Sequence, residues 1–195
     1  MASQKIVYDL LISVFCSFLL STCLLSISTS NWNVTTHPIT TDTNNAIKCL
    51  RLLSPGQQTL IKWIINTKTS IEIRTGLFQT CFSKFCASSQ LFTESAIPIP
   101  SKRTLTLAVI GILLLFIGTL TSFIMLFSSC MTPNQTYALI PLSLFFSGVS
   151  MTLVLIQTID TLNINGYSGY IYIIDTVLSY VLAGIALVQM QLFYI

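Results

Sequence analysis

The chain has 195 residues, of which 53% are apolar and only 8% are charged. A soluble domain usually carries about a quarter charged residues. So few charges exclude an ordinary soluble surface and favour a lipid bilayer as the solvent. The net charge of +3 comes from scattered residues with no basic cluster between base-stacking aromatics, which argues against a nucleic-acid partner.

Four apolar stretches predict the fold class: an all-α membrane protein, with a four-helix transmembrane bundle and a small extracellular antiparallel β-sheet. A bilayer requires about 20 residues per span, and each span must be helical because lipid offers no partner to backbone polar groups. The predicted order is a cytoplasmic N-terminus (1–5), span one (6–28), a large extracellular loop (29–103), span two (104–128), a cytoplasmic hairpin (129–136), span three (137–159), a second extracellular loop (160–168), and span four with a very short C-terminus (169–195).

The first span could also be a cleaved signal peptide. Its apolar run is longer than the usual core of about 7–15 residues, and Asp9 interrupts its start. Both features favour an uncleaved helix.

The orientation of the large loop rests on opposing signals. Lys102 and Arg103, at the mouth of the second span, favour a cytoplasmic loop. The rule that basic residues beside a span stay in the cytoplasm is weaker for loops longer than about 60 residues. The glycosylation sequon at Asn33, followed by the cysteine pair discussed below, favours an extracellular loop. We therefore expect both termini in the cytoplasm and Asn33 as a candidate glycan site.

The large loop contains patterns typical of strands. Ile71–Arg74 alternates apolar and polar residues, which predicts a half-buried strand. Thr59–Ile65 is also strand-like, and Ala46–Leu53 is compatible with either a helix or a strand. We expect a small antiparallel sheet packed on the outer end of the bundle.

Cys81 and Cys86 admit three interpretations. A zinc site needs further ligands, and the loop offers only Cys49 and His37 without paired spacing. A redox pair of the thioredoxin kind needs Cys-x-x-Cys, which is absent. A disulfide between neighbouring strands needs only an oxidising compartment and suitable geometry, so it is the preferred interpretation. Cys49 is left either as a buried thiol or as a residue able to exchange into the pair.

Together, several loop residues resemble the first-loop signature of the claudin and peripheral myelin protein 22 superfamily. They are Trp32, Gly76-Leu77-Phe78, Cys81, Cys86 and Arg103. Phe78 stands where that family has Trp. The long gap from Trp32 to Gly76 is similar to that of calcium-channel gamma-type accessory subunits. The resemblance implies a four-span fold with an extracellular sheet and an interaction role. The chain shown has no tail of the kind that ends in a PDZ ligand, so we expect no scaffold anchoring of that type.

Polar residues inside the predicted spans have a packing and a functional interpretation. Ser13, Ser17 and Ser21 form a small polar stripe, which favours close helix packing over a pore lining. Asp175 either lies in water near the start of the fourth span or contacts a polar helix of a partner, such as a channel. Cys130, just past the second span, is a candidate for palmitoylation.

No pattern in the sequence predicts an enzyme, a cofactor site or a small-molecule substrate, since the single histidine has no partnered nucleophile and no phosphate loop is present. Two non-catalytic functions remain. The first is a claudin-like structural or interaction protein of the plasma membrane, acting in adhesion, barrier formation or membrane organisation at a cell junction. The second is an accessory subunit of an ion channel or receptor. The expected partners are the bilayer and another membrane protein: a second copy, a claudin-like protein or a channel.

Overall fold

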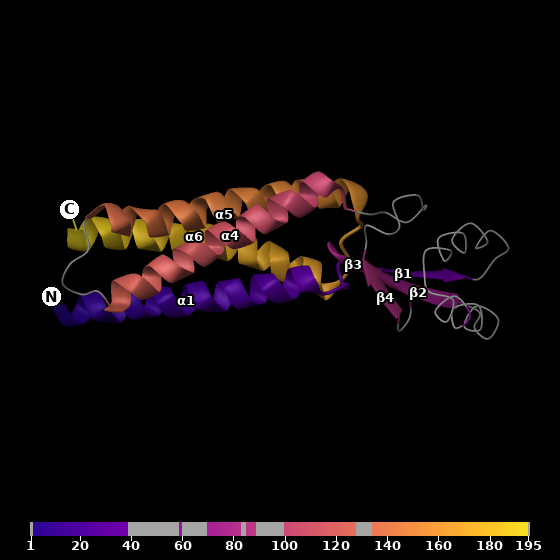
Figure 1. Cartoon of the computed structure of the whole chain (residues 1–195), viewed down its shortest axis with the longest axis horizontal. Coiled ribbons are helices and arrows are strands. Elements are labelled where there is room, and N and C mark those ends of the chain that lie inside the picture. Colours follow the sequence, from indigo (N-terminus) through magenta and orange to yellow (C-terminus); the bar gives the residue numbers. More distant parts are fainter. Residues whose placement is uncertain are drawn as a thin grey trace. The chain divides into compact units, whose positions relative to one another are not determined.

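A computed structural model describes residues 2–38, 59, 70–82, 85–88, 100–127 and 134–194. In chain order the elements are α1 (Ala2–Ser28), β1 (Asn33–Pro38), β2 (Ser70–Thr75), β3 (Gln79–Phe82), β4 (Phe85–Ser88), α4 (Lys102–Phe127), α5 (Asn134–Thr161) and α6 (Tyr167–Tyr194) (Figure 1). The chain divides into two compact units. The helical unit comprises Met1–Ser26, Lys102–Ile156 and Ile171–Ile195, and the sheet unit comprises Ile27–Ser101 and Gln157–Tyr170.

The helices coincide with the predicted spans to within a few residues at each end. Four helical segments of the described residues are long and apolar enough to cross a membrane, namely Lys5–Ser28, Lys102–Phe127, Tyr137–Thr161 and Tyr167–Leu192. Their mean hydropathies lie between 2.1 and 2.5. Composition alone locates such segments well, because a spanning helix must be apolar over its whole length.

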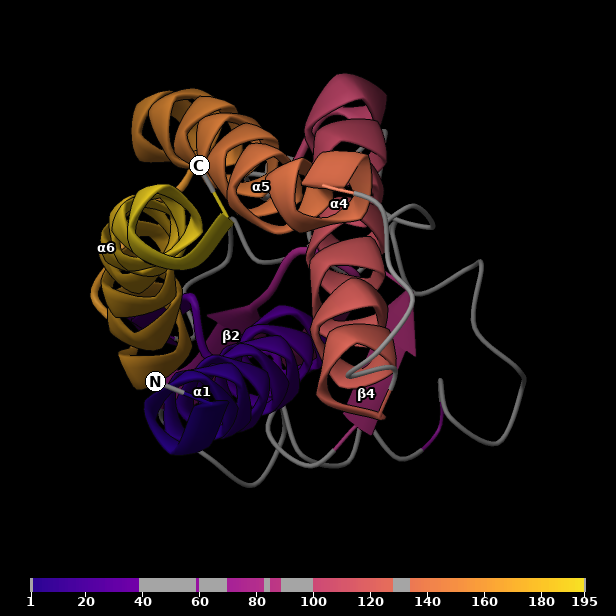
Figure 2. The same ribbon diagram turned by 90° about the vertical axis from the view of Figure 1, so that its left-hand side faces the viewer.

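The helical unit is an up-and-down bundle in which α1 and α5 each lie between α4 and α6 (Figure 2). Hydroxyl groups link neighbouring helices by donating to backbone carbonyls: Ser147 to Gly111 at 2.8 Å and Ser179 to Leu144 at 2.7 Å. The start of α1 and the end of α6 lie at the same end of this unit (Figure 1). An even number of helices brings the chain back to the side from which it started.

The bundle has apolar outer faces and a partly polar interior, the reverse of a soluble protein. Leu25 and Phe18 are 63% and 59% exposed, whereas Ser147 and Ser179 are fully buried. Small and hydroxylated residues let helix backbones approach closely where no hydrophobic effect drives association. The outer faces of the four helices therefore suit lipid better than water.

The sheet unit contains a four-stranded antiparallel sheet in the order β1-β2-β3-β4 among the described residues. The predicted strand at Ile71–Arg74 is confirmed as the centre of β2. Its Ile73 pairs with Thr35 of β1 on one side and with Phe82 of β3 on the other. The segments Ala46–Leu53 and Thr59–Ile65 lie outside the described residues, apart from Thr59.

Candidate functional site

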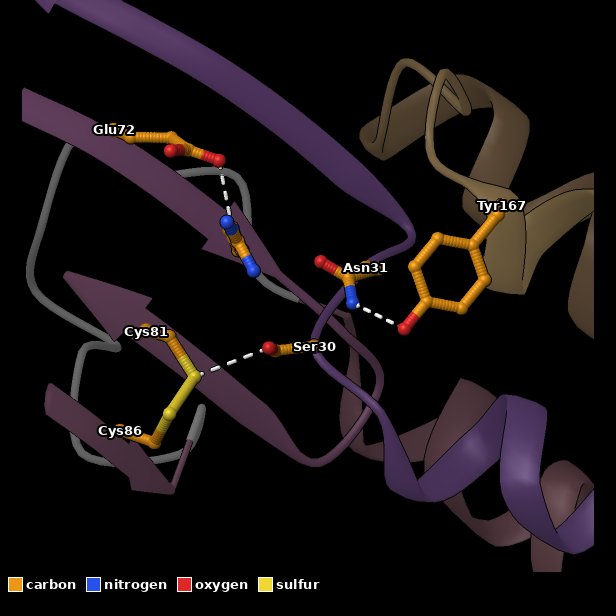
Figure 3. Close-up of a disulfide and its surroundings, with 7 residues drawn as sticks. Ser30, Asn31, Glu72, Cys81, Cys86 and Tyr167 are labelled. Carbon is orange, nitrogen blue, oxygen red and sulfur yellow. Dashed lines mark hydrogen bonds and ion pairs between the residues drawn. A yellow bond between two sulfur atoms is a disulfide. The ribbon is translucent and has the colours of Figure 1, made fainter. Parts of the chain in front are cut away.

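The hairpin formed by β3 and β4 is closed by a disulfide. Cys81 and Cys86 lie directly opposite each other in the register, and their sulfur atoms are 2.03 Å apart (Figure 3). This geometry agrees with the predicted disulfide. Cys81 is buried and Cys86 is exposed. The hydroxyl of Ser30, just past α1, donates a hydrogen bond of 3.1 Å to the sulfur of Cys81, which ties the hairpin to the α1–β1 connection.

The signature residues Trp32, Gly76, Leu77 and Cys81 come together in the sheet unit. Trp32 and Leu77 are fully buried, and the amide of Trp32 donates to the carbonyl of Thr75 at 3.1 Å. A side chain at Gly76 would collide with the backbone of the α1–β1 connection at the carbonyl of Thr29. The glycine thus permits a close approach of two backbones that a Cβ atom would block.

The remaining signature residues take more exposed places. Phe78 is half-buried in the turn between β2 and β3, where the amide of Gly76 donates to the carbonyl of Gln79 at 2.7 Å. Arg103 is exposed in the first turn of α4 and belongs to the helical unit. The sequence places Arg103 at the entry to the second span, and in the structure it lies in the first turn of α4.

A clamp from the α5–α6 connection, which the sequence analysis did not foresee, holds the start of β1. The side chain of Asn165 accepts from the amide of Val34 at 2.7 Å and donates to its carbonyl at 2.9 Å. The amides of Asn165 and Gly166 both donate to the carbonyl of Trp32, at 3.2 and 3.0 Å. A Cβ at Gly166 would collide with the carbonyl of Asn31. The one local feature of the sequence that indicates a turn here is the Asn165-Gly166 pair.

The same connection makes two further side-chain contacts with the segment before β1. The hydroxyls of Thr29 and Ser168 are 2.6 Å apart, and the amide of Asn31 donates to the hydroxyl of Tyr167 at 2.6 Å (Figure 3). Residues 139 and 136 positions apart in the chain are thereby joined in one structural unit.

Asn33, the candidate glycan site, is only 4% exposed. Its side-chain oxygen is buried without a hydrogen-bond partner among the residues that the structure describes. A glycan on the amide nitrogen would need room that this packing does not leave. Glycosylation of Asn33 stays a prediction.

On the surface of the sheet, Glu72 of β2 accepts a hydrogen bond of 2.7 Å from Arg74 of the same strand (Figure 3). This hydrogen bond and the charge of the carboxylate raise the pKa of the guanidinium. Both side chains are 42% exposed. An exposed ion pair of this kind contributes little to the stability of the sheet.

Asp175 lies inside the helical unit. Its side chain is 2% exposed and accepts a hydrogen bond of 2.8 Å from Thr22 of α1. Its second oxygen is buried without a hydrogen-bond partner in the described part of the chain. From the sequence we expect Asp175 to lie in water or to contact a partner helix. In the structure the carboxyl group joins α6 to α1 of the same bundle, and contact with a partner helix stays a prediction.

A second polar contact joins the same two helices closer to the chain ends. The amide nitrogen of Gln189 donates to a carboxylate oxygen of Asp9 at 2.6 Å.

The serine stripe of α1 plays a smaller part in helix packing than expected. Ser13 is buried, Ser17 is half-buried and Ser21 is exposed, and each donates to its own helix four residues earlier.

Cys49 and Cys130 lie outside the described residues, so the pairing of the first and the proposed palmitoylation of the second stay predictions. Cys16 and Cys23 are buried in α1 and are not part of a disulfide.

Comparison with known proteins finds no family model and no curated protein that matches this chain.

Proposed function

We propose that this chain is a four-span integral membrane protein with a non-enzymatic structural or interaction role, and that its sheet unit forms the recognition surface outside the cell. The class follows from the outer faces of the four helices. Large apolar side chains such as Phe18, Leu25 and Ile156 are exposed on them, and contiguous apolar surface of this extent is rare on soluble monomers. This observation carries the proposal.

The sheet unit supports an interaction role more than a catalytic one. A covalent link between Cys81 and Cys86 and the clamp from Asn165 hold the strands in one arrangement. A surface that is fixed before binding loses less conformational freedom when a partner docks. The likeness to the claudin and peripheral myelin protein 22 superfamily, drawn from the signature around Trp32 and Cys81, adds adhesion, barrier formation or membrane organisation as the specific role.

The membrane topology is tested by cysteine accessibility on intact cells. In a background with Cys49 and Cys130 replaced by Ser, two variants are compared: Thr36→Cys, at an exposed position of β1, and Ser3→Cys, which precedes the apolar segment that begins at Lys5. A membrane-impermeant maleimide should label the Thr36→Cys variant on intact cells and the Ser3→Cys variant only after permeabilisation. The reverse pattern would refute the extracellular sheet.

The role is tested by expression in cells that do not aggregate by themselves. Cell aggregation, or strands seen by freeze-fracture, would support adhesion or barrier formation. Both should be lost in a Cys81→Ser/Cys86→Ser variant that still reaches the cell surface. Stable co-purification with a larger channel or receptor, without aggregation, would instead favour an accessory subunit and refute the adhesive role.

A further inference from the structure

A small cavity in the helical unit receives a polar side chain from each of its four helices. Its volume is about 20 Å³, counted as the space open to the centre of a water molecule. The polar residues that line it are Asp9 of α1, Ser122 of α4, Tyr137 of α5 and Gln189 of α6. One water needs about 10–15 Å³ on this measure and two to four polar partners.

The hydrogen bonds around the cavity define the chemistry of its occupant. The amide nitrogen of Gln189 faces the Asp9 carboxylate, because a carboxylate can only accept. The amide oxygen of Gln189 and the second oxygen of Asp9 make no hydrogen bond with any described residue. Ser122 already gives its proton to the carbonyl of Thr119 at 2.7 Å, so it too offers an acceptor. The occupant must therefore donate hydrogen bonds or carry positive charge.

A cation is the poorer of these two occupants. The ammonium group of Lys5 lies 3.2 Å from the hydroxyl of Tyr137 and above its ring. This fixed positive charge stands beside the cavity and already offsets the charge of Asp9. A second cation would be repelled by Lys5. Water supplies two donors without adding charge.

We propose that this cavity binds a single water molecule, which donates to Asp9 and Gln189 and links the four helices at the end of the bundle that carries both termini. Its remaining lone pairs can accept from a neighbouring hydroxyl. Water of this kind is part of a structure and is costly to remove. The direct contact between Asp9 and Gln189 joins only α1 and α6. The water would connect these two helices to α4 and α5 as well.

Radiolytic footprinting of the purified protein in micelles tests the proposal. Hydroxyl radicals formed from a bound water attack the side chains beside it, and methionine is among the most reactive. Met125 lines the cavity and is 2% exposed, whereas Met151 is fully buried in the same unit and is not among the lining residues. We expect Met125 to be oxidised several-fold faster than Met151. Equal protection of both residues would overturn the proposal.

A cavity-filling variant separates a bound water from ordinary exposure at this site. Ala186 also lines the cavity and is 6% exposed, so Ala186→Val would occupy the space of the water. We expect this variant to protect Met125 and to lower the melting temperature, since Asp9 and Gln189 each lose a hydrogen-bond donor. A raised melting temperature would indicate a dry cavity, which gains from being filled, and would overturn the proposal. A higher melting temperature in sodium chloride than in choline chloride would show that the cavity binds a cation and not water, and would also overturn the proposal.

Discussion

The hydroxyl of Thr22 donates a hydrogen bond of 2.8 Å to the buried carboxyl group of Asp175, 153 residues further along the chain. Hydrogen bonds between spanning helices average about 0.6 kcal/mol and reach about 1.7 kcal/mol. The contact between Thr22 and Asp175 belongs at the upper end of that range, because the second carboxyl oxygen has no hydrogen-bond partner among the described residues.

Thr22→Val removes the donor and leaves both oxygens of Asp175 unpaired. We expect the free energy of unfolding in mixed micelles to fall by about 1–2 kcal/mol. Thr106→Val is the matched control, since Thr106 is exposed on α4 and donates only to its own helix, at Lys102. Equal effects of the two substitutions would contradict the structural role of the contact. Asp175→Asn keeps an acceptor for Thr22 and should cost less than Thr22→Val.

Gly118 of α4 lies against Ser143 of α5, so a Cβ atom there would be 2.6 Å from the serine hydroxyl oxygen. Gly118→Ala forces that hydroxyl away from its hydrogen bond with the carbonyl of Ile140, at a cost of about 1 kcal/mol. Gly184→Ala is the control, because a Cβ at Gly184 meets no atom within 4 Å. Thermal unfolding in detergent measures both variants.

A rescue experiment strengthens this test. Ser143→Ala removes the oxygen that a Cβ at Gly118 would meet, while the next nearest atom, the Cβ of Ser143, is at an ordinary 3.6 Å. The double variant should therefore recover the stability of Ser143→Ala alone. A penalty for Gly118→Ala that persists in the Ser143→Ala background would show that the helices pack differently at this point.

Asn165 should protect the start of β1 from local opening. Asn165→Asp replaces the amide that donates to the carbonyl of Val34 by a carboxylate oxygen, which repels that carbonyl. Hydrogen exchange at the amide of Val34 should become about five- to tenfold faster, as expected for a loss of about 1 kcal/mol or slightly more. Asn163→Asp adds the same charge two residues away at an exposed position and should leave exchange unchanged. Similar exchange in the two variants would refute the clamp.

The disulfide should stabilise the sheet unit modestly, because it closes a short loop. Loop-entropy arguments give about 2 kcal/mol for a ring of this size. The Cys81→Ser/Cys86→Ser variant should unfold at correspondingly lower denaturant concentration. Dithiothreitol should bring the wild type to the same midpoint and leave the variant unaffected. A variant as stable as the oxidised wild type would show that the strands need no covalent link.

Much of the helical unit can be predicted from the sequence. A spanning helix must be apolar along its length, so composition in a short window locates α1, α4, α5 and α6 to within a few residues. The strand at Ile71–Arg74 is visible for a similar local reason, since its alternation reflects one buried and one exposed face. The disulfide is also foreseeable, because Cys81 and Cys86 are close in sequence and suit a hairpin.

The sequence alone determined local structure: four apolar helices, a strand in the large loop and a short cysteine hairpin. Only the tertiary structure decided which polar groups meet across long stretches of chain, such as Asp9 with Gln189, 180 residues apart, and Asn165 with Val34. It also placed Asp175 inside the bundle and buried Asn33. Hydropathy and periodicity report how a residue relates to its neighbours in sequence. The rotation and register of one helix against another follow from packing, which no local pattern records.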